Sequence, residues 1–533
     1  MVNTMTVNQV GIRAKAVVRK KGFTVSWWMF AVTGLLLAIA GTLGFDVYSG
    51  KLGIIGPQFE IVANGANKII KVPPGGNVQA AIERAEAGDI VELQAGAVYY
   101  GEIKLPNKPF SDYVTIQSSA ASSLPAGKRV GPAQKSSMAT ILTRTAGRPA
   151  ISAANGANHY RFIGIEFSSA TAEYVYNLVL LGNGETAANL PHDIEIDRCY
   201  LHPAKAGVMR RGIAINSANT TVKNSYIEGF GFQNEETQGI AGWTGTRKVK
   251  ILNNYIEGGA ENILFGGSDP ASADLVPTDI EIRGNHLNKP EAWRGKTTLK
   301  TLFELKNSRH VEFAENYLEN NWLGSAFRIT VRNQDGEAAF STVEDTNIHD
   351  NIVNGAGEGI NILGKDDTHP SGTLKRLTIT NNLFLNIGND PFEGSGYFVQ
   401  VADGEDITIA NNTVFNTGNI TSFYAAIPRN FVLRDNIIGH GAYGVHGIDT
   451  RGPAAVAMFQ NNLIVNNKRV GDGDRAFPSG NIWLADFGKV GFAAMAQNDY
   501  SLTPGSKFKS AAKNRSDIGA STAKLPLGEL KKP

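Results

Sequence analysis

The sequence predicts an all-β solenoid, a chain that winds through many short strands into stacked coils. A short phrase recurs ten times between residues 198 and 466, mostly with asparagine as its second residue. The phrases are 24 to 35 residues apart, and a short alternating segment precedes each of them. Glycine makes up 59 of the 533 residues, above the usual share of about 7%. Regular spacing and frequent turns are typical of a repeat architecture.

The repeats indicate a single-stranded right-handed parallel β-helix over residues 70–521. Segments such as HDIEID and TDIEIRG alternate apolar and polar residues, which is the period of a strand. Asparagine suits a tight corner because it tolerates left-handed backbone, and its amide can bond to the equivalent amide one coil away. One coil cannot bury its inward face alone. We therefore expect one elongated unit rather than several domains.

The two ends of the array have sequences of their own. Residues 77–87 (NVQAAIERAEA) place apolar side chains at helical spacing, which predicts an amphipathic helix that caps the first coil. The next segment, residues 88–96, is the expected first strand. We expect residues 46–69 to form a linker and residues 522–533 a flexible tail.

The N-terminus predicts export or membrane anchoring. Residues 1–24 form a basic leader without acidic residues, and residues 25–45 contain no charge over a length that can cross a bilayer. Small residues before Gly41 favour a cleaved signal peptide, whereas the full length of the segment favours a retained anchor. Both alternatives stay open. Either one places the chain after residue 46 outside the cytoplasm.

Composition excludes several classes of protein. Lysine and arginine number 51 against 49 aspartate and glutamate residues, so the chain carries no charge excess typical of a nucleic-acid binder. The single cysteine, Cys199, excludes an intramolecular disulfide framework and a cysteine-based zinc site. Any attraction for an acidic polymer must therefore come from a local group of cations. The oligomeric state does not follow from the sequence.

The opening of the array resembles that of a known superfamily. Residues 77–103 (NVQAAIERAEAGDIVELQAGAVYYGEI) and the closing phrase DIGA are similar to the pectate-lyase-like superfamily of right-handed parallel β-helix proteins. The resemblance implies the fold. It leaves the activity open, because this scaffold hosts lyases, hydrolases, esterases, epimerases and adhesins.

One column of outward side chains is a candidate site. In TLFELKN, Phe303 and Leu305 are expected to face inward, so that Glu304 and Lys306 face outward. On the next coil, the same alternation places Arg328 outside. Further polar residues at related positions on nearby coils are Gln238, Glu261, Asn262, Thr330, Arg332, Asn333, Asn361 and Gln400.

This set suits the cleavage of a uronate-containing polysaccharide by β-elimination. That reaction needs a base for the proton beside the carboxylate and a cation to neutralise the carboxylate. We assign Lys306 as the base and Arg328 as the neutralising group or acid, with Glu304 tuning Lys306 or binding calcium. The residues expected to bind substrate are Gln238, Arg332, Asn333, Asn361 and Gln400.

The arrangement is similar to that of the alginate lyase and chondroitinase B family. In that family a strand lysine and an arginine about one coil later act beside asparagine and glutamate ligands of calcium. The resemblance implies a Ca²⁺ ion held by Glu261, Asn262 and Glu304. The chain departs from the family pattern because two glutamates closely preceding the lysine are absent.

Other interpretations remain beside this one. Trp243, Trp293 and Trp322 fall in or beside loops, where indoles stack on sugar rings or pack against the solenoid wall. The charged column is also compatible with an exposed ion-pair ladder of little energetic value, and hence with a non-catalytic carbohydrate-binding or surface protein. A second alternative is a polygalacturonase-like hydrolase, suggested by Asp366, Asp367 and the GHG phrase around His440.

Overall fold

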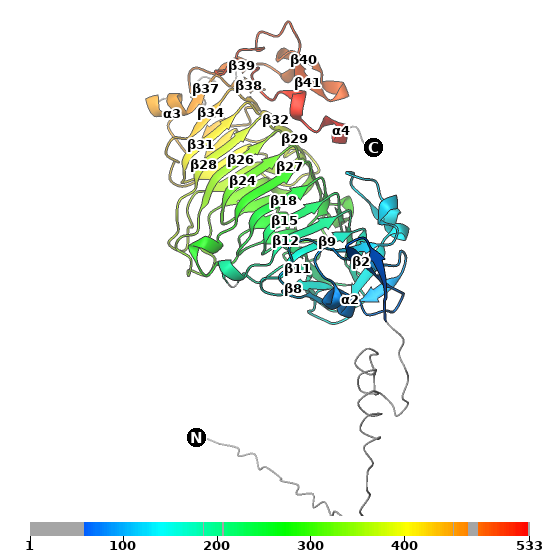
Figure 1. Cartoon of the computed structure of the whole chain (residues 1–533). Helices are drawn as coiled ribbons and strands as arrows, with labels where there is room; N and C mark the ends of the chain where they lie inside the picture. The colour runs from blue at the N-terminus through cyan, green and yellow to red at the C-terminus, as the bar shows by residue number, and fades with distance from the viewer. Residues whose placement is uncertain (1–57, 185, 205–206, 451, 467–477, 531–533) are drawn as a thin grey trace, which may run out of the picture. The chain divides into compact units, whose positions relative to one another are not determined.

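The computed structural model describes residues 58–184, 186–204, 207–450, 452–466 and 478–530. The predicted leader (1–24) and the predicted signal or anchor segment (25–45) lie outside these ranges. Within them, no helix is both long and apolar enough to span a bilayer. From Phe59 onward, the described chain forms one compact unit of coils stacked in sequence order (Figure 1).

The coils build a parallel β-helix with three stacks of strands, which confirms the predicted all-β class. The first stack is a 15-stranded sheet, parallel except for its first pair. From β12 onward, each of its strands lies just before one of the recurring phrases. The strands of this stack are β1 (Glu60–Asn64), β2 (Asn67–Val72), β3 (Ile90–Leu93), β6 (Val114–Ser118), β9 (Asn158–Ile163), β12 (His192–Asp197), β15 (Ala218–Lys223), β18 (Arg247–Leu252), β21 (Thr278–Arg283), β24 (Ser308–Ala314), β26 (Val343–His349), β28 (Lys375–Thr380), β31 (Glu405–Ala410), β34 (Val432–Arg434) and β37 (Phe459–Gln460).

A 24-stranded sheet comprises the second and third stacks. The second stack contains β4 (Val98–Tyr100), β7 (Ala139–Thr143), β10 (Ile165–Ser169), β13 (Tyr200–Leu201), β16 (Tyr226–Ile227), β19 (Tyr255–Glu257), β22 (His286–Asn288), β29 (Leu383–Ile387), β32 (Thr413–Asn416), β35 (Ile437–Gly439), β38 (Leu463–Val465) and β39 (Ile482–Leu484). The third contains β5 (Ile103–Leu105), β8 (Ile151–Ala153), β11 (Val175–Leu180), β14 (Met209–Ala214), β17 (Gln238–Gly242), β20 (Glu261–Phe265), β23 (Thr301–Leu305), β30 (Val399–Ala402), β33 (Thr421–Phe423) and β36 (Val445–His446). Two long strands, β25 (Tyr317–Thr330) and β27 (Ile352–Leu363), pass through both stacks.

Helices lie at the ends and in the loops. Helix α2 (Val78–Arg84) begins after Asn77, whose side chain accepts a hydrogen bond from the Ala80 N–H at 2.9 Å. Its Val78, Ala81 and Ile82 side chains are buried in the main core, as expected of a capping helix. The remaining helices and short strands are α3 (Pro453–Met458), α4 (Leu527–Leu530), η1 (Ala121–Ser123), η2 (Pro132–Ser137), η3 (Ala187–Asn189), η4 (Ala273–Leu275), η5 (Glu291–Trp293), η7 (Phe487–Lys489), η8 (Met495–Gln497), η9 (Thr522–Lys524), β40 (Phe492–Ala494) and β41 (Asp499–Leu502).

The ends of the array differ from the expectation. Part of the predicted linker, residues 46–69, forms the hairpin of β1 and β2, and β2 pairs with β3 as the first parallel rung. The predicted flexible tail, residues 522–533, is folded through Leu530. Leu525 is buried against Tyr317 and other apolar side chains of the second stack, and this apolar contact fixes the segment.

The recurring phrase forms two kinds of corner contact. Its first residue has left-handed backbone on coil after coil, for example Asn253 with φ 53° and Asp350 with φ 59°. In eight of the ten phrases the second residue is an asparagine, and these residues form the predicted ladder, which Asn481 extends beyond the last phrase. The Nδ2 atom of each member donates to the Oδ1 atom of the next at 2.9–3.1 Å along Asn254, Asn285, Asn316, Asn351, Asn382, Asn412, Asn436, Asn462 and Asn481.

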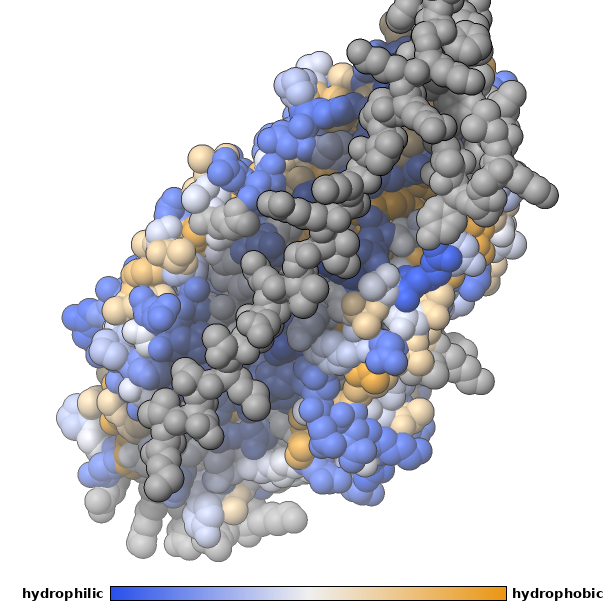
Figure 2. All heavy atoms as spheres, turned by 90° about the horizontal axis from the view of Figure 1, so that it is seen from below, coloured by the Kyte–Doolittle hydropathy of each residue, from blue (hydrophilic) through white to orange (hydrophobic). Residues whose placement is uncertain are grey.

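Apolar side chains from all three stacks fill the interior. In the central coils, Phe327 packs edge-on against Phe303 and Phe384 with ring centroids 6.5 and 5.9 Å apart. The outer surface seen in Figure 2 is mostly hydrophilic, with small apolar patches. The rigid core therefore leaves the outward positions of each strand free to carry polar side chains.

Candidate functional site

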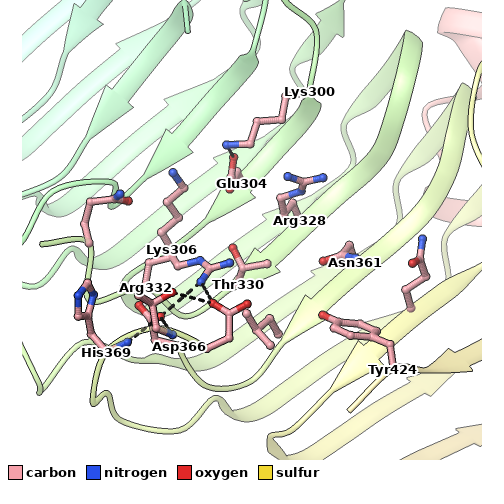
Figure 3. A pocket seen from close by; sticks show the side chains of 15 residues that line it. Lys300, Glu304, Lys306, Arg328, Thr330, Arg332, Asn361, Asp366, His369 and Tyr424 are labelled. Atoms are coloured by element: carbon pink, nitrogen blue, oxygen red, sulfur yellow. Dashed lines mark hydrogen bonds and ion pairs between the residues drawn. The ribbon is translucent and has the colours of Figure 1, made fainter. Parts of the chain in front are cut away.

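A groove of about 480 Å³ lies on the outer face of the third stack, over β23, β25, β27 and β30 (Figure 3). Such a volume is in the usual range for a ligand site. Charged and polar side chains dominate its lining. The lining residues are Lys300, Glu304, Lys306, Arg328, Thr330, Arg332, Gln334, Asn361, Leu363, Asp366, Asp367, Thr368, His369, Gln400 and Tyr424.

The strand register places one predicted side chain on each rung. Glu304 of β23 pairs with Arg328 of β25, Arg328 with Asn361 of β27, and Asn361 with Gln400 of β30. Their inward neighbours, such as Phe303 and Ile329, are fully buried. Alternation along each strand therefore forms the column that the repeated phrases predict.

Two buried carboxylates share one ammonium at the bottom of the groove. Lys300 Nζ lies 2.9 Å from an oxygen of Glu261 and 2.9 Å from an oxygen of Glu304. The side chains of Glu261 and Glu304 are 0% and 1% exposed. Glu261 also accepts a hydrogen bond from Gln238 Nε2 at 2.7 Å. Because Lys300 ends the loop before β23, the loop and the strand together build this cluster.

The two carboxyl groups of the cluster have pKa values shifted in opposite directions. Burial raises the pKa of Glu304, and the nearby Glu261 carboxylate raises it further. Burial acts against ionisation of Glu261 too, but the Lys300 charge and the hydrogen bonds to its carboxylate lower its pKa. The pKa of Lys300 is above its ordinary value because the two carboxylates outweigh the effect of burial.

Lys306 and Arg328 are the cations of the groove without a counter-ion. Among the residues that the structure describes, neither has a carboxylate oxygen within 4.0 Å. Gly266 and Gly267 leave space beside Lys306, since a Cβ atom on Gly266 would lie 2.9 Å from Lys306 Cβ. Both cations belong to half-buried side chains that line the groove (Figure 3).

One wall of the groove is an ion-paired loop cluster. Arg332 contacts the carboxylates of Asp366 and Asp367. Asp366 also accepts N–H bonds from Asn333 and Thr368 at 2.7 and 2.8 Å. Burial alone would raise the pKa of Asp366, but these hydrogen bonds and the Arg332 charge lower it. This carboxylate is therefore held ionised as a structural acceptor.

A second carboxylate fixes the neighbouring loop. Asp269 accepts hydrogen bonds from the backbone N–H groups of residues 334, 335 and 337 at 2.6–3.0 Å. The Asn333 side chain closes the same loop, because its Oδ1 atom accepts from the Ala338 N–H at 2.7 Å. These bonds hold Gln334 at the edge of the groove.

Comparison with known proteins identifies the fold. Residues 301–499 match the family model described as "Right handed beta helix region". Over this range the parallel coils therefore match right-handed β-helix proteins. A search of curated protein sequences finds no match.

Several solved structures are similar to this β-helix. An alginate lyase from Paenibacillus sp. FPU-7 is 13% identical over 72% of this chain and 99% of its own, with a TM-score of 0.35. A mutant of the PL6 family alginate lyase AlyGC is 16% identical over 86% of this chain and 58% of its own, with a TM-score of 0.47. The Streptococcus pneumoniae surface protein and adhesin PfbA is 12% identical over 76% and 95%, with a TM-score of 0.38.

The β-helix does not bring every predicted residue into the groove. Asn333 is fully buried, and its side chain stabilises a loop instead. Gln238 is 1% exposed and bonds to Glu261 beneath the groove. Asn262 is fully buried, and its Nδ2 atom donates to the carbonyls of Ile256 and Asn288 at 2.8 Å.

None of the three predicted tryptophans lines the groove. The Trp243 ring lies 4.6 Å from the Arg211 guanidinium, and Trp293 packs on Gly231. Trp322 is 7% exposed, stacks on Phe392 and donates from Nε1 to the Lys289 carbonyl at 3.0 Å. These three tryptophans therefore pack against the solenoid, as the second of the two alternatives predicts.

The predicted calcium ligands fit a divalent ion poorly. Lys300 already bridges Glu261 and Glu304, so its ammonium occupies the position between the two carboxylates. Calcium takes six to eight oxygen ligands. Within the described ranges, no group of three or more histidine, cysteine, aspartate or glutamate side chains is arranged to hold a metal. We therefore derive no chemical step through calcium.

The residues of the hydrolase alternative are divided between two places. Asp366 and Asp367 line the groove, but Arg332 pairs with both. His440 follows β35 of the second stack, is 2% exposed and lies 5.3 Å from the Trp483 ring. It does not line the groove, so the three residues do not form one constellation there.

Sequence reasoning missed several lining residues because they come from loops. Lys300, His369 and Tyr424 lie outside the alternating segments that predict direction. Tyr424 directly follows β33, so extending the alignment by one residue past the strand would have found it. For Lys300 and His369 no such signal exists, since the path of each loop depends on tertiary contacts.

Proposed function

We propose that this β-helix binds an acidic, uronate-containing polysaccharide in the groove and cleaves it by β-elimination. The observation that carries the proposal is that some cations of the groove are ion-paired and others are not. Lys306 and Arg328 have no carboxylate partner among the described residues, whereas Lys300 pairs with Glu304, and Arg332 with both aspartates. The two free cations supply the attraction that a net charge of only +2 does not.

Each group has a defined part in the proposed reaction. Arg328 neutralises the uronate carboxylate and stabilises the negative charge that develops as the adjacent C–H bond breaks. Asn361, the next rung, donates its amide to the same group. Lys306 takes the proton, and it must first lose a proton of its own to act as the base. The electron pair of the C–H bond forms the new C=C bond, the glycosidic C–O bond breaks, and the leaving oxygen takes a proton from Lys306 or from water.

The test is a substrate panel of pectate, alginate and glycosaminoglycans. Cleavage by this route produces an unsaturated uronate, which is followed by its ultraviolet absorbance. With the active substrate, Lys306→Ala is expected to lower the rate by about 100-fold or more, and Arg328→Ala by about 100- to 1,000-fold. Lys365→Ala is the matched control, because this exposed lysine does not line the groove and its variant should keep the wild-type rate.

The outcomes separate the functional classes. Full activity of Lys306→Ala would remove Lys306 as the base. New reducing ends without an unsaturated product would favour hydrolysis. Binding that Arg328→Ala abolishes, with no cleavage of any polymer, would favour the non-catalytic carbohydrate-binding alternative. Since such polymers lie outside the cytoplasm, the proposal includes export or anchoring through residues 25–45.

A further inference from the structure

We propose that the Lys300 ammonium takes the place of a divalent cation at the bottom of the groove, so that the site keeps its two buried carboxylates without a bound metal. The inference concerns the cohesion of the β-helix and does not depend on the proposed reaction. In this proposal the Lys300 ammonium replaces the calcium ion that the family resemblance implies at Glu261 and Glu304.

The first argument is that the Lys300 ammonium already offsets part of the charge of both carboxylates. Two carboxylates that are both almost fully buried repel each other and lose the solvation of water. Lys300 Nζ lies 2.9 Å from each, and Glu236 adds a third carboxylate oxygen at 3.8 Å. A lysine ammonium is a compact charge with three donors, and its position between the two side chains is the one that a bridging ion would take.

The second argument is the charge of the surroundings. Arg328 is the rung neighbour of Glu304, and Lys306 follows Glu304 on the same side of the strand. A divalent ion at the pair would have to displace the Lys300 ammonium and would then face these two cations. Like charges in a partly buried site repel strongly. The groove is therefore better matched to a single internal ammonium than to calcium.

The third argument is that the next coil holds the backbone of Lys300 in place. The Lys300 carbonyl accepts a hydrogen bond from Asn321 Nδ2 at 3.3 Å. Gly324, with φ 82°, passes so close that a Cβ atom there would lie 2.6 Å from the same carbonyl. This close approach requires glycine, and it fixes the end of the loop from which the ammonium reaches inward.

The test uses the full-length protein and needs no substrate. Thermal unfolding is measured in excess calcium and in excess EDTA, and calcium binding is measured by calorimetry. The wild type should melt at the same temperature in both solutions and bind no calcium. Lys300→Met should lower the melting temperature by about 5 °C or more, because it leaves buried charge unpaired. Lys296→Met is the control, since this lysine of the same loop is exposed.

A charge-balanced variant separates loss of the ammonium from loss of packing. Lys300→Met combined with Glu304→Gln leaves one buried carboxylate, Glu261, instead of two, so it should recover part of the lost melting temperature. The inference is overturned if calcium raises the melting temperature of the wild type by several degrees, or if wild type binds calcium and Glu304→Gln does not. Equal melting temperatures for Lys300→Met and Lys296→Met would also overturn it. None of these readouts depends on lyase activity, so each proposal can fail separately.

Discussion

Glu257 shows what burial does to a carboxyl group that has no cation beside it. Its side chain accepts hydrogen bonds from the Tyr255 hydroxyl at 2.7 Å and from the Gly229 N–H at 2.8 Å. The residue is 6% exposed, and no basic partner lies within ion-pair distance among the described residues. Burial raises the pKa of Glu257 to about 7 despite the two hydrogen bonds. Glu261, a few residues later, has Lys300 and the opposite shift.

Stability should therefore fall as Glu257 ionises. Its folded-state pKa lies above the unfolded value, so its contribution is fully present below the unfolded pKa and is lost as the pH rises through the folded one. The loss is about 3 kcal/mol between about pH 4 and about pH 8. Glu257→Gln should flatten this part of the stability profile, measured by denaturant unfolding at several pH values. The exposed Glu337→Gln is the control, and parallel profiles for Glu257→Gln and wild type would contradict the assignment.

At the scale of the element, the asparagine ladder joins coils that are far apart in sequence. Asn316 donates through Nδ2 to Asn351 and to the Ile282 carbonyl, and its Oδ1 atom accepts two bonds from Asn285. All of these groups are buried. Each rung of the ladder therefore satisfies polar groups of the rungs before and after it.

Asn316→Ala should destabilise the chain markedly. Each buried group left without a partner costs about 1–3 kcal/mol, and the change removes partners from more than one. Thermal unfolding compared with Asn347→Ala checks this. Asn347 is half-buried and makes a single side-chain hydrogen bond, to Glu312 at 3.2 Å. Similar melting temperatures for both variants would show that the ladder contributes little.

The strands could be predicted from the sequence, and the loops could not. Alternation fixes the direction of a side chain once its inward neighbours are recognised, so Glu304, Arg328, Asn361 and Gln400 were placed on one face. The depth of Glu304 was missed, because it depends on Lys300 reaching over it from a loop. The sequence leaves the place of the tryptophans open between the groove and the wall, since aromatic side chains beside loops pack wherever the wall offers a hollow.

At the scale of the whole molecule, the segments before and after the coils lie outside the repeat pattern. The hairpin of β1 and β2 precedes the capping helix, and the segment ending in α4 folds back onto the second stack. Glu529 of α4 lies 4.0 Å from Arg129 and 3.9 Å from His286. The sequence gives no periodic signal for either segment, so their place followed only from tertiary contacts.

Removal of residues 522–533 should weaken the C-terminal half. The deletion uncovers the apolar cluster around Leu525 and Tyr317, and the loss of one buried leucine alone costs about 2 kcal/mol or more. A lower melting temperature and increased binding of a hydrophobic dye are expected. Deletion of residues 531–533 alone is the control. An unchanged melting temperature after the longer deletion would show that the segment is dispensable.

The strand register sets the spacing of the polar side chains along the groove. Glu304, Arg328, Asn361 and Gln400 are separated by unequal stretches of sequence, yet adjacent rungs lie about 4.8 Å apart. Loop insertions between rungs change the walls without changing this spacing. A substitution in the column therefore exchanges one functional group at a fixed position along the groove and leaves the other positions unchanged. The strand spacing of the β-helix thus fixes the distance between functional groups, while the identity of each group can change independently.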